Sequence, residues 1–485
     1  MKRGFFHNAL KIASYAAVAL TMASCVLGKK YQSPDLHLPD RIAGATEAES
    51  NDSLLFADMK WWEVYADTTL QHLISATLEN NKDLVIAAER VQELAQLRRI
   101  DNAAMLPAIG ADIYAEPEWE NYGGDNPKTS PEYNATLTFS WELDLWGRLR
   151  WERRKSIAEY LASVEAQRAL QMTLVAEVAQ AYFELVALDN ELAIVRQTLA
   201  TREEGVRQAR LRFESGLTSE TSYQQSKVEL ASTATLVPEL IQQVAAKEHE
   251  IALLAGRYPS PVERAGFDSS ERLPDHLPVG LPSELLRRRP DVREAEQALM
   301  AANAAMGVAY TDRFPRIRLT GDYGLQSDVV QTILRSPYAI INGDLLAPLF
   351  AFNAKRAKYR AAQHAYKQEV ARYEKTVLTV FQEASDAIVR YNSAREAREL
   401  KKNLEQASLK YVELARLQYI NGVINYLDLL DAQRKYFDAQ IGFSNAVRDE
   451  YIALVLLYKA LGGGWGQMMP EEAAAGGTAS GTVAE

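Results

Sequence analysis

One stretch of strict alternation leads directly into a very long helical segment. In residues 135–145, A-T-L-T-F-S-W-E-L-D-L, the odd positions are apolar and the even positions are polar. A period of two predicts a strand with one apolar and one polar face, and about ten residues is the length of a membrane-crossing β-strand. Residues 148–204 contain neither Gly nor Pro, and their apolar spacing predicts a helix on the order of 85 Å long. A half-buried strand of a soluble sheet would alternate in the same way, so residues 135–145 alone leave both interpretations open.

The second half of the chain repeats this arrangement. Each half is expected to contain a helix, two strands, a long helix, a tight turn and another helix, and matching stretches lie 206–208 residues apart. The first turn, R-L-R-F-E-S-G, ends at Gly216, and the second, R-L-Q-Y-I-N-G, ends at Gly422. The sequence therefore predicts a tandem duplication. The expected strands are residues 109–119, 135–145 and 317–326, and a less regular one that ends near residue 346, with loops at 121–132 and 327–337.

Four membrane strands cannot close a barrel. Open strand edges are not tolerated in hydrocarbon, so several copies must pool their strands. Two, three or four chains would supply eight, twelve or sixteen strands, and the sequence alone does not decide among them. A soluble coiled-coil protein with incidental strands is the alternative, but it leaves the paired strands unexplained.

The first 25 residues form a targeting segment. Lys2 and Arg3 precede an apolar run at residues 12–22, and M-A-S-C then ends at Cys25, the only cysteine of the chain. This pattern is similar to a bacterial lipobox, in which the cysteine becomes the lipidated first residue of the mature protein. Val26 follows in place of aspartate, which favours sorting to the outer membrane. A plain signal peptide that happens to contain a cysteine is the alternative.

Composition narrows the functional classes. The net charge is −10, which argues against a nucleic-acid-binding protein. The six histidines show no ligand spacing, and no common catalytic motif occurs. We therefore expect no enzymatic activity, no cofactor and no metal site. After residue 25 there is no run of eighteen apolar residues, so a membrane span would have to be a closed β-barrel.

These patterns divide the chain into six parts. We expect a signal peptide (1–24), a lipidated extended segment (25–60) and a first repeat (61–257). A Pro-rich linker (258–282), a second repeat (283–461) and a flexible tail (462–485) follow.

Four motifs carry a family resemblance, and they occur in order along most of the mature chain: W-E-L-D-L-W-G-R at 141–148, L-P-S-E-L-L-R-R-R-P-D-V at 281–292, G-V-I-N-Y-L-D-L-L-D-A-Q-R at 422–434 and Y-K-A-L-G-G-G-W at 458–465. The chain resembles the TolC-like outer-membrane efflux factors, in the NodT-type lipoprotein branch that serves resistance-nodulation-division pumps. The resemblance implies an α+β fold in which a homotrimer forms a twelve-stranded β-barrel, four strands per chain, continued by a long α-helical barrel. It also implies a periplasmic adaptor and an inner-membrane transporter as partners, contact with outer-membrane lipid, and a large periplasmic part.

A candidate gate lies where the two halves differ. When the tip glycines are aligned, Asp428 and Asp431 fall opposite Ser222 and Gln225. Only the second half therefore carries two carboxylates one helical turn apart, on one face. In a trimer they would form a ring of six, and rings of this kind select cations.

The family resemblance assigns matching aspartates to the periplasmic gate. Leu427 could add an apolar ring, and Arg434, one turn beyond Asp431, could supply a salt-bridge latch. The plain alternative is a solvated acidic helix face near a turn.

The function that we expect is passive conduction of small toxic compounds or drugs out of the periplasm. The outer channel of a type I protein secretion system or of a metal-ion exporter is an alternative. A structural periplasmic lipoprotein without a pore is a third hypothesis, from another class.

The lipobox generates the first prediction, that Cys25 is the acylated N-terminus of the mature protein. Mass spectrometry of the N-terminal peptide should detect the acyl chains on this residue. A free N-terminus at any other residue would contradict the prediction.

Overall fold

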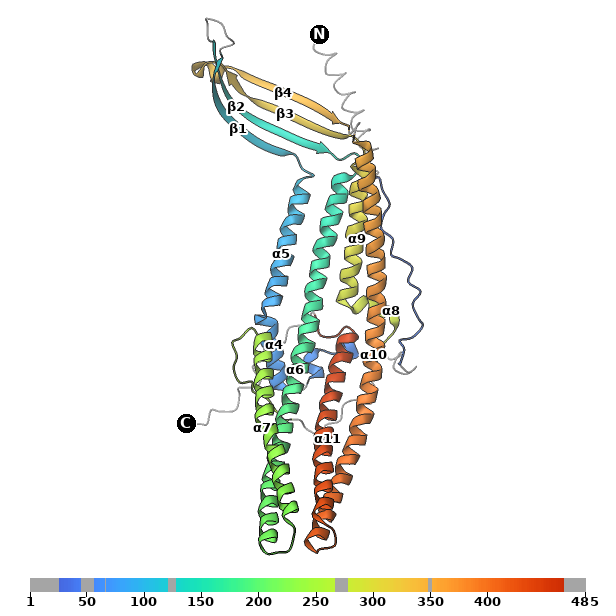
Figure 1. Ribbon diagram of the computed structural model, residues 1–485. Coiled ribbons are helices and arrows are strands. Elements are labelled where there is room, and N and C mark those ends of the chain that lie inside the picture. Colours follow the sequence, from blue (N-terminus) through green and yellow to red (C-terminus); the bar gives the residue numbers. More distant parts are fainter. Residues whose placement is uncertain are drawn as a thin grey trace, which may run out of the picture. The chain divides into compact units, whose positions relative to one another are not determined.

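The computed structural model describes residues 26–44, 56–65, 67–120, 128–266, 278–347 and 351–465. The chain forms two compact units, and each combines segments of both repeats (Figure 1). We call them the sheet unit (Met1–Leu36, Glu89–Val164 and Arg293–Lys375) and the tip unit (His37–Ala88, Glu165–Val292 and Thr376–Glu485). The predicted signal peptide and Cys25 lie outside the described residues, as does nearly all of the predicted tail.

The sheet unit contains one antiparallel sheet in the order β1-β2-β3-β4. The strands are β1 (Ala108–Glu120), β2 (Lys128–Leu143), β3 (Arg316–Ser327) and β4 (Pro337–Leu346), with a 3-10 helix, η2 (Val330–Arg335), between the last two. All four predicted strands are present. The predicted loop at 121–132 extends too far in the C-terminal direction, because residues 128–132 pair with β1 and belong to β2. Residues 121–127 lie outside the described part of the chain.

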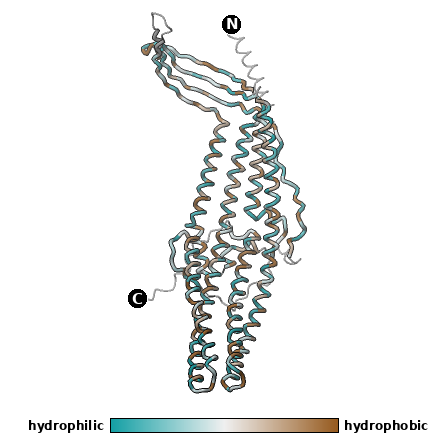
Figure 2. Tube along the Cα trace, in the orientation of Figure 1, coloured by the Kyte–Doolittle hydropathy of each residue, from teal (hydrophilic) through white to brown (hydrophobic). Residues whose placement is uncertain are grey.

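The strand register separates an apolar face from a polar face, and Figure 2 shows the alternation along each strand. Ala111, Leu137, Tyr323 and Ala339 form one row across the four strands. These side chains share a face because they are directly opposite one another. Leu137 is 54% exposed and Tyr323 is 64% exposed, so none of the described residues covers this apolar face.

The opposite face carries charged and hydroxyl side chains. In the strand register Arg318 lies opposite Glu142 of β2 and opposite Asp344 of β4, so a positive charge lies between two negative ones. Thr136 is buried, and its hydroxyl is 2.5 Å from the hydroxyl of Tyr338 on β4. β1 and β4 are the two edges of the sheet, and each edge offers backbone groups for pairing.

The helices follow the two repeats. The first contributes η1 (Phe56–Asp58), α3 (Trp61–Val64), α4 (Thr68–Asn80), α5 (Lys82–Ala103), α6 (Arg148–Glu214) and α7 (Glu220–Leu254). The second contributes α8 (Pro282–Arg288), α9 (Pro290–Thr311), α10 (Phe352–Ile420) and α11 (Tyr426–Ala460). Among the described residues, no helix is both long enough and apolar enough to cross a membrane.

The sequence predicts a single helix from Trp61 to Leu73, but the structure contains two helices there, so this prediction is wrong. Asp67 accepts hydrogen bonds from the backbone N–H groups of Thr69, at 2.8 Å, and Leu70, at 3.3 Å. A side-chain acceptor of this kind starts a new helix, because it satisfies N–H groups that have no partner in the first turn. The chain therefore forms the short α3 and then α4.

A buried arginine joins three helices of the tip unit. The Arg289 side chain is only 3% exposed. It pairs with Asp291 at 2.6 Å and with Glu383 of α10 at 2.7 Å, and it donates to the carbonyl of Ala460 at the end of α11, at 3.1 Å. Burial alone would lower the pKa of Arg289, but the two carboxylates raise it. The R-R-R-P-D motif is therefore a structural junction.

The sheet generates the second prediction, that the apolar face is turned to lipid. Single cysteines at Leu137 and Phe139 should resist a membrane-impermeant thiol reagent, whereas those at Thr138 and Ser140 should react. Phe139→Arg should cost about 2–4 kcal/mol near the bilayer midplane, and Ser140→Arg should cost little. Equal labelling at 139 and 140 in the folded protein would contradict this orientation.

Candidate functional site

The two tip turns have the same geometry. Gly216 ends the α6 segment with a φ of +72°, and Gly422 ends the α10 segment with a φ of +71°. The N–H of Leu217 donates to the carbonyl of Arg212 at 2.8 Å, and the equivalent bond after Gly422 is 2.9 Å. A left-handed residue is needed to form this helix ending, and glycine adopts it without strain. Each turn leads into a second helix, so α6 with α7 and α10 with α11 form two hairpins (Figure 1).

The candidate gate carboxylates lie in the first turns of α11. Asp428 and Asn425 form a capping box, in which the N–H of Asp428 donates to Asn425 Oδ1 at 3.1 Å and the N–H of Asn425 donates to Asp428 Oδ2 at 3.3 Å. Asp431 pairs with Lys435, one turn on, at 2.8 Å. Both aspartates and Leu427 are exposed. The structure therefore places the three side chains on one open stretch of helix beside the tip.

Arg434 binds a residue of the other repeat. Its guanidinium pairs with Glu229 of α7, which also pairs with Arg202 of α6 at 3.0 Å. Arg202 donates in addition to the hydroxyl of Thr233 and lies over the ring of Phe437, 5.8 Å from its centroid. We call Arg202, Glu229 and Arg434 the inter-hairpin ion network, because it joins α6 and α7 to α11.

Burial and neighbouring charges determine the protonation states of the inter-hairpin ion network. The side chains of Arg202 and Glu229 are only 9% and 10% exposed. The hydrogen bond from Arg434 lowers the pKa of Glu229, whereas burial lowers the pKa of Arg202. Glu229 is thus held as a carboxylate between two guanidinium groups, and loss of its charge would leave Arg202 buried without its anion.

The sequence suggests a salt-bridge latch between Arg434 and Asp431, but the structure pairs each of them with another residue. Asp431 forms an ion pair with Lys435, and Arg434 forms one with Glu229. Sequence reasoning missed Glu229, which is 205 residues from Arg434. One signal was available: at the offset between the tip glycines, Glu229 aligns with Lys435, the neighbour of Arg434. Opposite charges at matching positions of two repeats can meet when the repeats pack side by side.

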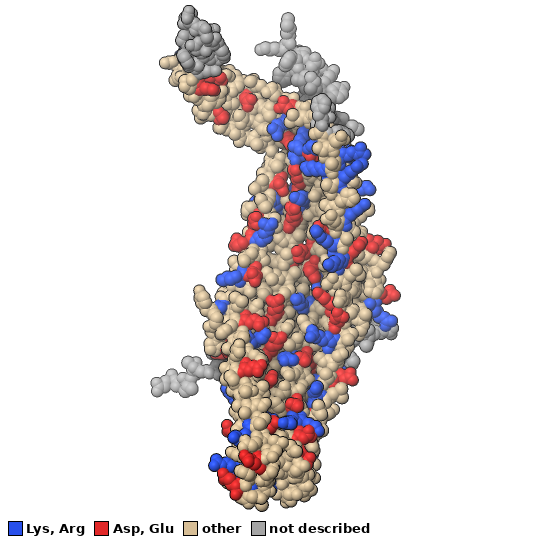
Figure 3. Space-filling view, viewed as in Figure 1, with Lys and Arg blue, Asp and Glu red and all other residues tan. Residues whose placement is uncertain are grey.

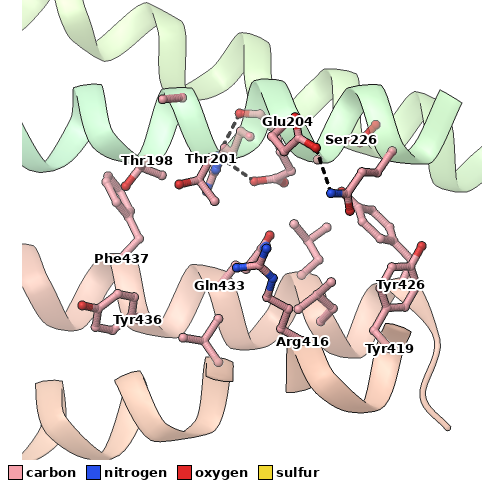
Figure 4. A pocket seen from close by; sticks show the side chains of 18 of the residues that line it. Thr198, Thr201, Glu204, Ser226, Arg416, Tyr419, Tyr426, Gln433, Tyr436 and Phe437 are labelled. Atoms are coloured by element: carbon pink, nitrogen blue, oxygen red, sulfur yellow. Dashed lines mark hydrogen bonds and ion pairs between the residues drawn. The ribbon is translucent and has the colours of Figure 1, made fainter. Parts of the chain in front are cut away.

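A cavity of about 630 Å³ adjoins the network, between the two hairpins (Figure 4). Arg416 reaches into this space, and Thr201 and Glu204 lie opposite, on α6. Its aromatic and amide lining includes Tyr419, Tyr426, Gln433, Tyr436 and Phe437. At this level the two hairpins are joined by polar contacts around a partly open space, and Phe437 of α11 adds an apolar contact with a buried cluster on α6 and α7. Within the described ranges, no cluster of His, Cys, Asp or Glu is placed to hold a metal ion.

Comparison with known proteins identifies the family. The family described as outer membrane efflux protein matches residues 73–257 and 281–463. The probable efflux pump outer membrane protein TtgC of Pseudomonas putida is 31% identical over 464 residues, which are 94% of this chain and 96% of that protein. The cation efflux system protein CusC of Escherichia coli is 29% identical over 453 residues, 93% and 98% of the two chains.

A solved structure shows the same fold. The outer-membrane channel OprN aligns with a TM-score of 0.85 at 29% identity, over 91% of this chain and 100% of that chain. The fold class predicted from the sequence, the trimeric α+β channel with four strands per chain and long helices, is therefore confirmed. Proteins of this kind are channels and not enzymes. The chain belongs to the outer membrane efflux protein family, and it is an outer-membrane efflux channel.

Proposed function

We propose that three copies of this chain form the outer-membrane exit of a tripartite pump for small toxic compounds or drugs. The partners would be a periplasmic adaptor and an inner-membrane resistance-nodulation-division transporter. The main support is the four-stranded sheet, which has one apolar face and two open edges. Such a sheet is stable in lipid only when further copies pair with both edges.

The names of relatives indicate which kinds of compound the channel could transport. One relative is named as an antibiotic efflux pump outer membrane protein and another as a cation efflux system protein. We favour small organic compounds, because two relatives that are 31% identical are named as antibiotic and toluene efflux pump outer membrane proteins. Export of metal ions is the second candidate, since an outer channel can conduct ions without binding them.

Susceptibility tests distinguish these cargos and give the third prediction. Deletion of the gene should make the host more susceptible to antibiotics and organic solvents, and the wild-type gene should restore resistance. Sensitivity to copper and silver salts should not change. A strain that becomes sensitive only to metal salts would favour the cation alternative. Unchanged sensitivity to every compound, together with no conductance of the purified protein in planar bilayers, would contradict the channel proposal.

We further propose that Asp428 and Asp431 form the periplasmic gate, with Leu427 beside them. The two carboxylates are exposed, lie one turn apart and start the helix that follows the second tip. In a trimer six carboxylates would surround the pore axis. The inter-hairpin ion network would act as the latch, because Arg434 ties the same helix to α7 only one turn from Asp431.

Charge removal at constant shape tests the gate and is the fourth prediction. Asp428→Asn with Asp431→Asn should raise single-channel conductance and weaken cation selectivity, while the trimer persists. Asparagine is chosen at 428 because its side-chain oxygen can still accept the bond from Asn425, so that the helix start survives. Glu229→Gln should also raise the open probability, because it weakens the hold of α7 on α11.

The matched control removes two exposed carboxylates farther from the tip, with Glu399→Gln on α10 and Asp449→Asn on α11. It should leave conductance and selectivity unchanged. Unaltered conductance in the folded Asp428/Asp431 variant, or an equal change in the control, would overturn the gate assignment and leave the channel proposal intact.

A further inference from the structure

Basic residues gather at one level of the sheet unit. Residues 142–160, 310–318 and 353–360 contain twelve Lys and Arg but only five Asp and Glu, in a chain whose net charge is −10. The first segment begins at the end of β2, the second leads into β3, and the third follows β4. We call these segments the basic collar. Figure 3 shows Lys and Arg concentrated where the strands meet the helices.

The acidic residues of the collar are already engaged. Arg148 pairs with both Glu142, at 2.9 Å, and Glu152, at 2.6 Å. Asp144 pairs with Arg150 at 3.1 Å, and Glu159 pairs with Lys155 at 3.3 Å. These contacts leave the collar with more cations than anions.

The fifth acidic residue, Asp312, is buried and accepts from three cations. Arg316 and Lys355 donate to it, and Lys358 lies at 3.4 Å. Although burial raises the pKa of Asp312, these cations lower it to about 2. Asp312 thus stays ionised and holds its partners in place.

Six arginines of the collar form no ion pair with any described residue. Of these, Arg154 and Arg313 lie over aromatic rings, and Arg318 lies opposite two carboxylates in the strand register. The other three, Arg153, Arg356 and Arg360, are exposed and have neither kind of neighbour. Arg356 and Arg360 lie one turn apart on α10, so they share a helix face. An exposed guanidinium can bind a phosphate through two parallel hydrogen bonds. The collar is therefore an anion-binding surface with open positions.

An aromatic layer lies at the same level. The ring of Trp146 stacks on Phe314 with centroids 5.2 Å apart, and Tyr310 contacts both Phe314 and Tyr359. The guanidinium of Arg313 lies 5.1 Å from the ring of Tyr310 and 5.3 Å from that of Tyr359. Tryptophan and tyrosine are enriched at the headgroup level of membranes. The apolar face of the strands is thus followed by a boundary in which aromatic rings and the basic collar lie together.

The start of the described chain is fixed at this level too. Trp151 is 2% exposed, and its Nε1–H donates to the carbonyl of Leu27 at 2.7 Å. The N–H of Leu27 donates to the carbonyl of Trp146 at 3.3 Å. Gly307 makes room for the indole, because a Cβ there would lie 2.4 Å from the Trp151 ring. Cys25 is two residues before Leu27, so its acyl chains would enter the bilayer beside the collar.

We propose that the basic collar binds the anionic headgroups of phospholipids, such as phosphatidylglycerol, in the periplasmic leaflet of the outer membrane. The inference rests on the proposed function, in which the helices extend into the periplasm. Phosphate groups supply the missing anions of Arg153, Arg356 and Arg360, and a polybasic surface is attracted to an anionic leaflet. The aromatic layer and the acylated N-terminus then anchor the channel at the depth that this leaflet sets.

Lipid retention by the full-length trimer tests the proposal. Wild-type protein is reconstituted in nanodiscs of phosphatidylethanolamine and phosphatidylglycerol, extracted in mild detergent, and its retained phospholipids are counted by native mass spectrometry. Phosphatidylglycerol should be enriched over phosphatidylethanolamine, and high salt should reduce the enrichment. Arg153→Gln with Arg356→Gln and Arg360→Gln should lower the affinity for phosphatidylglycerol by about tenfold or more.

The matched control removes three exposed cations of α10 that lie beyond the collar, with Lys375→Gln, Arg390→Gln and Lys401→Gln. It should retain phosphatidylglycerol as the wild type does. Equal retention of both lipids by the wild type would overturn the proposal. So would an equal loss in the control, or a preference for purified lipid A, which belongs to the opposite leaflet.

Two further measurements keep the result decisive. If the triple variant does not form trimers, the salt dependence of the wild type and the single change Arg356→Gln decide the outcome in the same way. Conductance recorded on the same preparations separates the two proposals. The collar variant should conduct as the wild type does, whereas a wild type that fails to conduct would count against the channel and leave the lipid preference as measured.

Discussion

Backbone hydrogen bonding in lipid is the constraint on which this structure depends. Each chain offers a sheet of four antiparallel strands whose outer members, β1 and β4, have one unpaired edge each. Water cannot satisfy those edges inside the hydrocarbon layer. The apolar row through Leu137 and Tyr323 requires an apolar environment as well, since it is exposed in the single chain. Oligomer formation and membrane insertion are therefore two consequences of one sheet.

Buried ion pairs connect the helices of the tip unit. Arg289 joins the start of α9 to α10 and to the end of α11, and Glu229 joins α6 and α7 to α11 through two arginines. Loss of Glu229 would cost most, on the order of 3–5 kcal/mol, because Arg202 would be left buried without its carboxylate. The two sites differ in what surrounds them. The Arg289 side chain is 3% exposed, whereas the Glu229 network borders a cavity of about 630 Å³ and its Arg434 side chain is 56% exposed. The first suits a permanent junction, and the second suits the latch that we propose.

The strand–helix boundary combines several means of fixing the depth of a protein in a bilayer. The apolar face ends there, Trp146 and Phe314 stack there, and the chain that follows Cys25 is held there by Trp151. Asp312 gathers three cations at the same level and keeps its charge under all ordinary conditions, since its pKa is about 2. These contacts connect the ends of β2 and β3 to α6, α9 and α10.

The sequence by itself determined the repeated architecture of this protein, the four strands, the two tip turns and the long helices. These features depend on local periodicity and on single glycines such as Gly216 and Gly422, which can be recognised without knowing what packs against them. It also placed Asp428 and Asp431 on one helix face, because that follows from their spacing. Only the tertiary structure showed that Asp67 splits the first helix, that residues 128–132 belong to β2, and that Arg434 binds Glu229 and not Asp431. The last two depend on which segments of the chain come together: the pairing of 128–132 with β1, and the packing of one repeat against the other. The Asp67 cap is a local contact with Thr69 and Leu70, which apolar spacing alone does not reveal. Side-chain partners across a repeat interface are chosen by that packing, and no local pattern in the chain encodes them.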